Sequence, residues 1–179
     1  MNQLKNPCVF LDRDGTVIVD RGYVYKIEDL EFMPGVLDGL MMLKKMGFLL
    51  VIITNQSGVA RGFYALNDVY QFHSEMNARL YSLREIKIDA FYICPHYEHG
   101  IIEPFSRKCQ CRKPSPYLLM KAAEEFQIDL SKSYMIGDKD CDVEAGRKAG
   151  LRNVFLVDNK HSFTDIAFHI LNDVEVNTE

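Results

Sequence analysis

The sequence has 179 residues, of which 47% are hydrophobic, and its formal net charge at pH 7 is -4. This length suits a single compact domain over residues 1–179 and leaves little room for two. The acidic balance and the absence of a Lys/Arg run argue against a nucleic-acid partner. No apolar run approaches the roughly 18 residues of a membrane span, and the N-terminus lacks the apolar stretch of a signal peptide. We therefore expect a cytoplasmic, monomeric protein with no membrane contact.

Apolar runs bounded by polar turn residues alternate along the chain with helical patterns. The runs predict buried strands over residues 8–11, 49–53, 90–93, 134–136 and 154–157. The helical patterns fall at 36–46, 67–84, 116–126, 143–149 and 163–171, and residues 172–179 are expected to fray. This alternation predicts an α/β fold, a Rossmann-like doubly wound parallel sheet with helices on both faces. In such sheets functional groups gather beyond the carboxyl ends of the strands.

The first predicted strand is followed by two carboxylates, Asp12 and Asp14, two residues apart on a loop. Asp12 can act as a nucleophile that forms an aspartyl-phosphate, while Asp14 can protonate the leaving oxygen and later deprotonate the attacking water. Such a pair needs a cation, because a carboxylate and a phosphate repel each other. A simple turn signal, Asp14-Gly15, would explain the pattern about as well.

The second predicted strand is followed by Thr54-Asn55-Gln56-Ser57 and then by small residues. The Thr54 hydroxyl and the Asn55 amide stand where a phosphate oxygen would lie, and the backbone N–H groups after them are free to point inward. This pattern is typical of an anion cradle. An ordinary polar loop that caps the next helix would have the same composition.

The fourth predicted strand leads into Asp138, Asp140 and Asp142. Asp138, nearest the strand, is the best second carboxylate ligand for Mg²⁺, which takes one or two carboxylates from a protein. Asp140 and Asp142 then lie outside the metal's ligand set or at the helix start, where acidic side chains complement the helix dipole.

Three thiols and one imidazole lie between the third strand and the next helix, at Cys94, His96, Cys109 and Cys111. This set matches the tetrahedral ligands of a structural Zn²⁺ site, so we expect a zinc-binding loop over 94–111. Incidental thiols are the alternative. Arg112 and Lys113 follow at once, and the loop would fix both cations. Lys113 could then neutralise the phosphate and Asp12 together, while Arg112 could hold a second anionic or hydroxylated part of the substrate.

Taken together, these motifs resemble the haloacid dehalogenase (HAD) superfamily. The matching set is Asp12-x-Asp14-Gly15-Thr16, Thr54-Asn55, Lys113-Pro114 and Gly137-Asp138 with Asp142, in the superfamily's order. The zinc loop and the segments 20–24, 54–62 and 111–114 further resemble the D-glycero-D-manno-heptose 1,7-bisphosphate phosphatases. The resemblance implies removal of the 7-phosphate, which gives heptose 1-phosphate for nucleotide-heptose and lipopolysaccharide core biosynthesis.

The resemblance also implies roles for individual residues. Asp12 is the nucleophile, Asp14 the acid/base, and Thr54 and Lys113 stabilise the phosphoryl group. Mg²⁺ is held by Asp12, the backbone carbonyl of Asp14 and Asp138. The residues expected to contact the substrate are Asp20, Arg21, Gly22, Tyr23, Asn55, Gln56, Ser57, Arg112 and Lys139.

Two alternatives stay open at this point. Histidinol-phosphate phosphatases share the aspartates and a similar zinc loop, although the segment 56–62 favours the heptose enzymes. A catalytically silent binding module on the same fold is the second alternative, and the intact aspartate pair argues against it. Neither the interval from Asp14 to Thr54 nor that from Cys94 to Lys113 has room for a cap domain, so we expect an open site.

Overall fold

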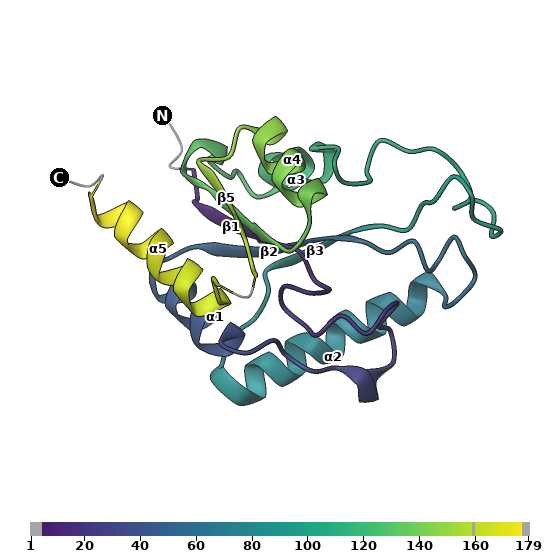
Figure 1. Cartoon of the computed structure of the whole chain (residues 1–179), viewed down its shortest axis with the longest axis horizontal. Coiled ribbons are helices and arrows are strands. Elements are labelled where there is room, and N and C mark those ends of the chain that lie inside the picture. Colours follow the sequence, from purple (N-terminus) through teal and green to yellow (C-terminus); the bar gives the residue numbers. More distant parts are fainter. Residues whose placement is uncertain (1–4, 159, 177–179) are drawn as a thin grey trace.

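A parallel β-sheet forms the middle layer of the molecule in the computed structural model, which describes residues 5–158 and 160–176 (Figure 1). Within these residues the sheet has five strands in the order β3-β2-β1-β4-β5. Their bounds are β1 Cys8–Leu11, β2 Leu49–Asn55, β3 Ala90–Cys94, β4 Tyr134–Gly137 and β5 Asn153–Leu156. The strand order reverses at β1, so the carboxyl ends of β1 and β4 border the switch point of the sheet.

Helices cover both faces of the sheet (Figure 1). The helices α1, α2 and α5 lie on one face, and α3 and α4 lie on the other. Their bounds are α1 Val36–Lys45, α2 Leu66–Arg84, α3 Tyr117–Glu125, α4 Asp140–Ala149 and α5 Phe163–Val176, with 3₁₀ turns at Ile27–Asp29 and Leu130–Lys132. The predicted doubly wound α/β fold is confirmed.

The central strand β1 shows why the apolar runs are continuous rather than alternating. Val9 and Leu11 pack under α1, α2 and α5, whereas Cys8 and Phe10 pack under α3 and α4. All four side chains are fully buried because both faces of the sheet are covered.

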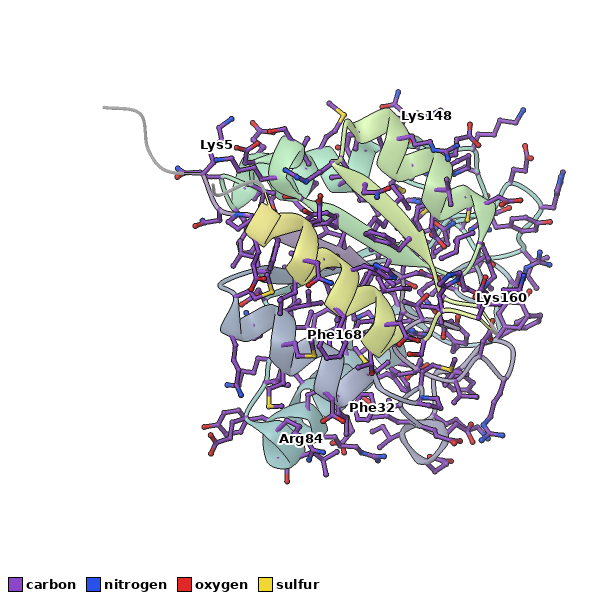
Figure 2. The ribbon with its side chains drawn as sticks, turned by 60° about the vertical axis from the view of Figure 1, so that its left-hand side comes forward. Lys5, Phe32, Arg84, Lys148, Lys160 and Phe168 are labelled. Carbon is purple, nitrogen blue, oxygen red and sulfur yellow. The ribbon has the colours of Figure 1, made fainter. Side chains whose placement is uncertain are left out.

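Close contact between α1 and α5 closes one side of the core. Thr164 donates a hydrogen bond to the carbonyl oxygen of Gly35 at 3.0 Å, and a Cβ on Gly39 would meet the ring of Phe163 at 2.5 Å. Figure 2 shows α5 beside α1, with the exposed Phe168 labelled. No helix in the described part of the chain is long and apolar enough to cross a membrane.

Two predicted boundaries are wrong. The helix expected from residue 143 begins at Asp140, because Asp142 accepts the backbone N–H of Lys139 and starts the helix there. The expected fraying after residue 171 is contradicted up to Val176, since α5 continues and Asp173 accepts hydrogen bonds from Tyr134 and Arg152. Residues 177–179 lie outside the described residues.

No second folded unit interrupts the described chain between β1 and β2 or between β3 and α3. This arrangement of the described residues agrees with the expectation that the chain has no cap domain. The long segment between β3 and α3 carries the Cys/His cluster and extends away from the sheet (Figure 1). That the whole of 1–179 forms one domain stays a prediction.

Candidate active site

Side chains from three neighbouring strands meet at the carboxyl edge of the sheet. Asp12 follows β1, Thr54 lies near the end of β2, and Asp138 follows β4. Parallel pairing of β1 with both β2 and β4 sets these three positions side by side. The chain then leaves β1 through Gly15, which has φ of +83°. A Cβ there would lie 2.4 Å from an Asp138 oxygen, so only glycine lets the two loops approach this closely.

Lys113 is the central cation of the site, and it is 3% exposed. Its Nζ lies 2.6 Å from an Asp12 oxygen and 2.7 Å from an Asp142 oxygen, and it donates to the carbonyl oxygen of Ile53 at 2.7 Å. Burial alone would lower the pKa of Lys113, but the two carboxylates outweigh it and raise the pKa. The lysine therefore stays charged and holds Asp12 in one position.

Asp12, Asp138 and Asp142 each place a carboxylate oxygen within 4.8 Å of the others. The other Asp142 oxygen accepts the backbone N–H of Lys139 at 3.1 Å, whereas one Asp138 oxygen is buried without a partner. Burial and the Asp12 charge raise the pKa of Asp138 to about 6. An unpaired buried oxygen among hard carboxylate ligands is the chemistry that Mg²⁺ prefers, so the residues fit this metal. The predicted metal role of Asp14 is through its backbone carbonyl, and its carboxylate is not part of this group.

The Asp14 carboxylate is held by two side chains instead. Arg13 donates to its two oxygens at 2.8 and 3.0 Å, and the Gln56 amide donates to it at 2.8 Å. Gln56 also donates to the Thr54 hydroxyl at 2.8 Å and accepts from the Tyr64 hydroxyl at 2.7 Å. Tyr64, Gln56, Thr54 and Asp14 are thus one connected network beside Asp12.

Arg13 is fully buried, which is rare for an arginine. Besides Asp14 it donates to the carbonyl oxygen of Val24 at 2.7 Å, lies 3.3 Å from Nε2 of His73, and stacks over the ring of Phe72. Sequence reasoning missed Arg13, Tyr64 and His73 as parts of the site. A charged residue between the two motif aspartates was a signal for Arg13, whereas nothing local points to His73, which comes from α2.

The Cys/His cluster comes together as the sequence predicts. Sγ of Cys94 lies 3.5 Å from Cys109 and 3.1 Å from Cys111, and Nδ1 of His96 lies 3.2 Å from Sγ of Cys111. Hydrogen bonding from Cys94 lowers the pKa of Cys111 to about 5, and the same contact raises the pKa of Cys94. Four soft ligand atoms within 4.8 Å of one another can hold a metal ion.

Asn55 connects this cluster to the sheet. Its side-chain amide donates to the carbonyl oxygen of Lys113 at 3.2 Å and accepts the Lys113 backbone N–H at 3.0 Å. Asn55 therefore fixes the backbone of Lys113 two residues after the last thiol, Cys111. The predicted anion-cradle role of its amide stays a prediction.

The other residues predicted to contact substrate differ in the contacts that they make. Asp20 and Asp138 flank the ammonium of Lys139 at 3.5 and 3.2 Å, so these three are brought together. Arg21 instead forms an exposed pair with Glu31. Gly22 donates its backbone N–H to Asp20, Tyr23 packs edge-on against Phe63, and Ser57 and Arg112 are half-buried. Their roles stay predictions.

Comparison with known proteins agrees with this geometry. A family model described as HAD-hydrolase-like matches residues 110–175. D-glycero-β-D-manno-heptose-1,7-bisphosphate 7-phosphatases from Yersinia pestis and Escherichia coli K12 are 44% and 45% identical over 151 residues, which is 84% of this chain and 80% and 78% of theirs. The crystal structure of D,D-heptose 1,7-bisphosphate phosphatase from B. bronchiseptica, complexed with magnesium and phosphate, is 25% identical. It superposes with a TM-score of 0.78 and covers 93% of this chain and 99% of that one.

The fold and these matches define a hydrolase of the HAD superfamily. Within it, the chain belongs to the D-glycero-D-manno-heptose 1,7-bisphosphate phosphatase family. The resemblance inferred from the motifs is confirmed.

Proposed function

We propose that this chain is a Mg²⁺-dependent phosphatase that removes the 7-phosphate of D-glycero-β-D-manno-heptose 1,7-bisphosphate. Its product is heptose 1-phosphate, for nucleotide-heptose and lipopolysaccharide core biosynthesis. The observation that carries the proposal is the Asp12–Lys113–Asp142 arrangement beside Asp138, at the switch point of a chain 45% identical to a phosphatase of that name. The β anomer is part of the proposal because the relatives bear it in their names.

Asp12 attacks the phosphorus of the 7-phosphate, and Lys113 offsets the negative charge of both. The Thr54 hydroxyl accepts from the Gln56 amide, and its own proton is donated to a phosphoryl oxygen. Asp14 gives its proton to the departing C7 oxygen, and the phosphoryl group stays on Asp12 as an aspartyl-phosphate. Asp14 then takes a proton from the water that hydrolyses this intermediate.

Asp12, the Asp14 carbonyl and Asp138 would hold the magnesium, with Asp142 turned toward Lys113. When bound, the ion reduces the repulsion between the phosphate and the carboxylates. Zinc in the Cys94, His96, Cys109 and Cys111 cluster has a structural role in this proposal, since four protein ligands leave no open position. In this proposal the protein is a monomer and its substrate is a small sugar bisphosphate. It acts in the cytoplasm, where thiols stay reduced.

The test is phosphate release with Mg²⁺ from both anomers of heptose 1,7-bisphosphate, with histidinol phosphate and fructose 1,6-bisphosphate alongside. We expect the β-heptose bisphosphate to have the highest kcat/KM. A preference for histidinol phosphate would reassign the substrate, and release from none of them would indicate a silent binding module.

Asp12→Asn should abolish turnover while the protein stays folded. The matched control is Asp140→Asn, which changes an exposed aspartate at the same edge of the sheet. Substantial phosphate release by a clean Asp12→Asn preparation would remove Asp12 from the nucleophile's role.

A further inference from the structure

The side-chain amide of Gln56 is fully occupied by partners inside the protein. Its Nε2 donates to an Asp14 oxygen and to the Thr54 hydroxyl, both at 2.8 Å. Its Oε1 accepts from the Tyr64 hydroxyl at 2.7 Å. Gln56 is 2% exposed, so both N–H donors and the carbonyl oxygen of this amide act within the protein. The amide therefore joins the loops that follow β1 and β2 beside the nucleophile.

The orientation of this amide decides what the Thr54 hydroxyl can do. With Nε2 toward Thr54, the hydroxyl oxygen accepts a hydrogen bond and its own proton is free for another acceptor. If the amide were turned by 180°, Oε1 would face Thr54 and take that proton. Only the observed orientation leaves Thr54 with a proton for a phosphoryl oxygen.

Asp14 by itself fixes the amide during only part of a reaction cycle. As a carboxylate it accepts from Nε2 of Gln56, which excludes the reversed amide. As a carboxylic acid, the form that protonates a leaving group, it could equally donate to Oε1 of a reversed amide. A second group must therefore hold the amide while Asp14 carries a proton.

The Tyr64 hydroxyl is a donor that does not change during such a cycle. Its proton is directed at Oε1 of Gln56, and a backbone hydrogen bond from Gly58 reaches its oxygen. Burial raises the pKa of Tyr64 to about 12, so the hydroxyl stays protonated at neutral and acidic pH. A reversed amide would take the acceptor away from this buried proton, which is costly.

The ring of Tyr64 is itself held closely. It stacks on Tyr25 with 4.8 Å between ring centroids, and it packs in a small apolar cluster with Val59. A Cβ on Gly58 would lie 2.3 Å from two carbons of the ring, so the loop after β2 can lie against the ring only with a glycine here. The hydroxyl therefore reaches the amide from a fixed position.

We propose that Tyr64 is a positioning residue for phosphoryl transfer. Through Gln56 it keeps the Thr54 proton available to the phosphoryl group and the Asp14 carboxyl in place for proton transfer. This inference rests on the proposed function, because it takes Asp14 and Thr54 in the roles given there. Neither Tyr64 nor Gln56 needs to touch the substrate, so loss of the contact should lower kcat more than it changes KM.

The first experiment measures kcat and KM of the full-length, metal-loaded enzyme on the β anomer of heptose 1,7-bisphosphate. Tyr64→Phe keeps the ring and removes the hydroxyl, so kcat should fall about ten-fold while KM changes less than about three-fold. The matched control is Tyr134→Phe, which removes a buried hydroxyl that donates to Asp173 at the opposite end of the sheet. It should change neither constant. An unchanged kcat in Tyr64→Phe, or an equal fall in Tyr134→Phe, would overturn the inference.

A double-mutant cycle tests whether Tyr64 acts through Gln56. Gln56→Met keeps the approximate shape of the side chain without its amide, so it should lower kcat at least as much as Tyr64→Phe does. In the Gln56→Met background, Tyr64→Phe should lower kcat less than about two-fold further. Losses that multiply would show that the hydroxyl acts by another route and would overturn the inference.

Hydrogen exchange tests the same contact without a substrate. NMR spectra of the unchanged, metal-loaded protein should show slow solvent exchange of the Gln56 side-chain N–H groups. Tyr64→Phe should speed this exchange at least about ten-fold, whereas Tyr134→Phe should not. If Tyr64→Phe speeds the exchange but the unchanged protein hydrolyses no heptose bisphosphate, the proposed function falls and the positioning of the Gln56 amide stands. Equal exchange in the Tyr64→Phe and unchanged proteins would overturn the inference and leave the proposed function intact.

Discussion

His73 should make the stability of this fold depend on pH between pH 7 and 5. Its side chain is 4% exposed, stacks on Phe91 with 4.4 Å between ring centroids, and lies 3.3 Å from a nitrogen of Arg13. An arginine nitrogen can only donate, so Nε2 of His73 accepts and its proton is on Nδ1. Burial and the neighbouring Arg13 cation lower the pKa of His73 to about 3.

The sign and size of the effect follow from the two pKa values. The folded pKa lies below that of the unfolded chain, about 6.5, so the unfolded state takes up a proton in this range and the folded state does not. Stability is therefore fully present above pH 6.5 and is lost as the pH falls. Between pH 7 and pH 5 this one group should cost about 2 kcal/mol of unfolding free energy, and an error of one unit in the folded pKa hardly changes that.

Urea unfolding of the metal-loaded protein at pH 7, 6 and 5 measures this difference. His73→Gln keeps an acceptor for Arg13 but cannot titrate, so its stability should fall by about 2 kcal/mol less than that of the unchanged protein over the same range. Other titrating groups are common to both proteins and cancel. Parallel pH profiles for the two proteins would show that His73 is not held neutral against Arg13.

Two further predictions concern the metal sites. Gly15→Ala should raise the Mg²⁺ concentration for half-maximal activity at least about ten-fold, because its Cβ would lie 2.4 Å from Asp138. Gly150→Ala is the control, because Gly150 also has a positive φ, +77°, but an added Cβ there would have no atom within 4 Å. An equal rise in the Mg²⁺ requirement of Gly150→Ala would show that the contact with Asp138 is not the cause. Cys111→Ala should lose the bound metal, measured by mass spectrometry, together with most activity, whereas buried Cys8→Ala should keep both. Full activity of metal-free Cys111→Ala would show that catalysis does not depend on metal in the cluster.

Much of the fold follows from local pattern. The runs that predict strands are apolar because the sheet is covered on both faces, and their order along the chain sets the carboxyl edge where Asp12 and Asp138 lie. The frayed terminus was predicted wrongly because the polar segment after residue 171 is held from a distance. Tyr134 on β4 and Arg152 both bond Asp173, and no local pattern contains that information.

Some residues of the candidate site could likewise be predicted from local sequence, and others could not. Asp12, Asp14 and Lys113 were found because their spacing along the chain matches a chemical requirement. The pairing of Asp142 with Lys113 was not found, because acidic residues at a helix start have an ordinary local explanation and only the folded chain brings Lys113 to it. Arg13 and His73 meet through α2, a helix whose sequence gives no sign of catalysis.

The side-chain amide of Asn55 bonds both backbone polar groups of Lys113, as the backbone of a neighbouring strand would. It donates to the carbonyl oxygen and accepts from the N–H, and neither bond involves the lysine side chain. Position 113 is therefore anchored independently of the ammonium it carries. A residue such as methionine could therefore replace the lysine without releasing the backbone at this position, while the buried carboxylates of Asp12 and Asp142 would lose their shared cation.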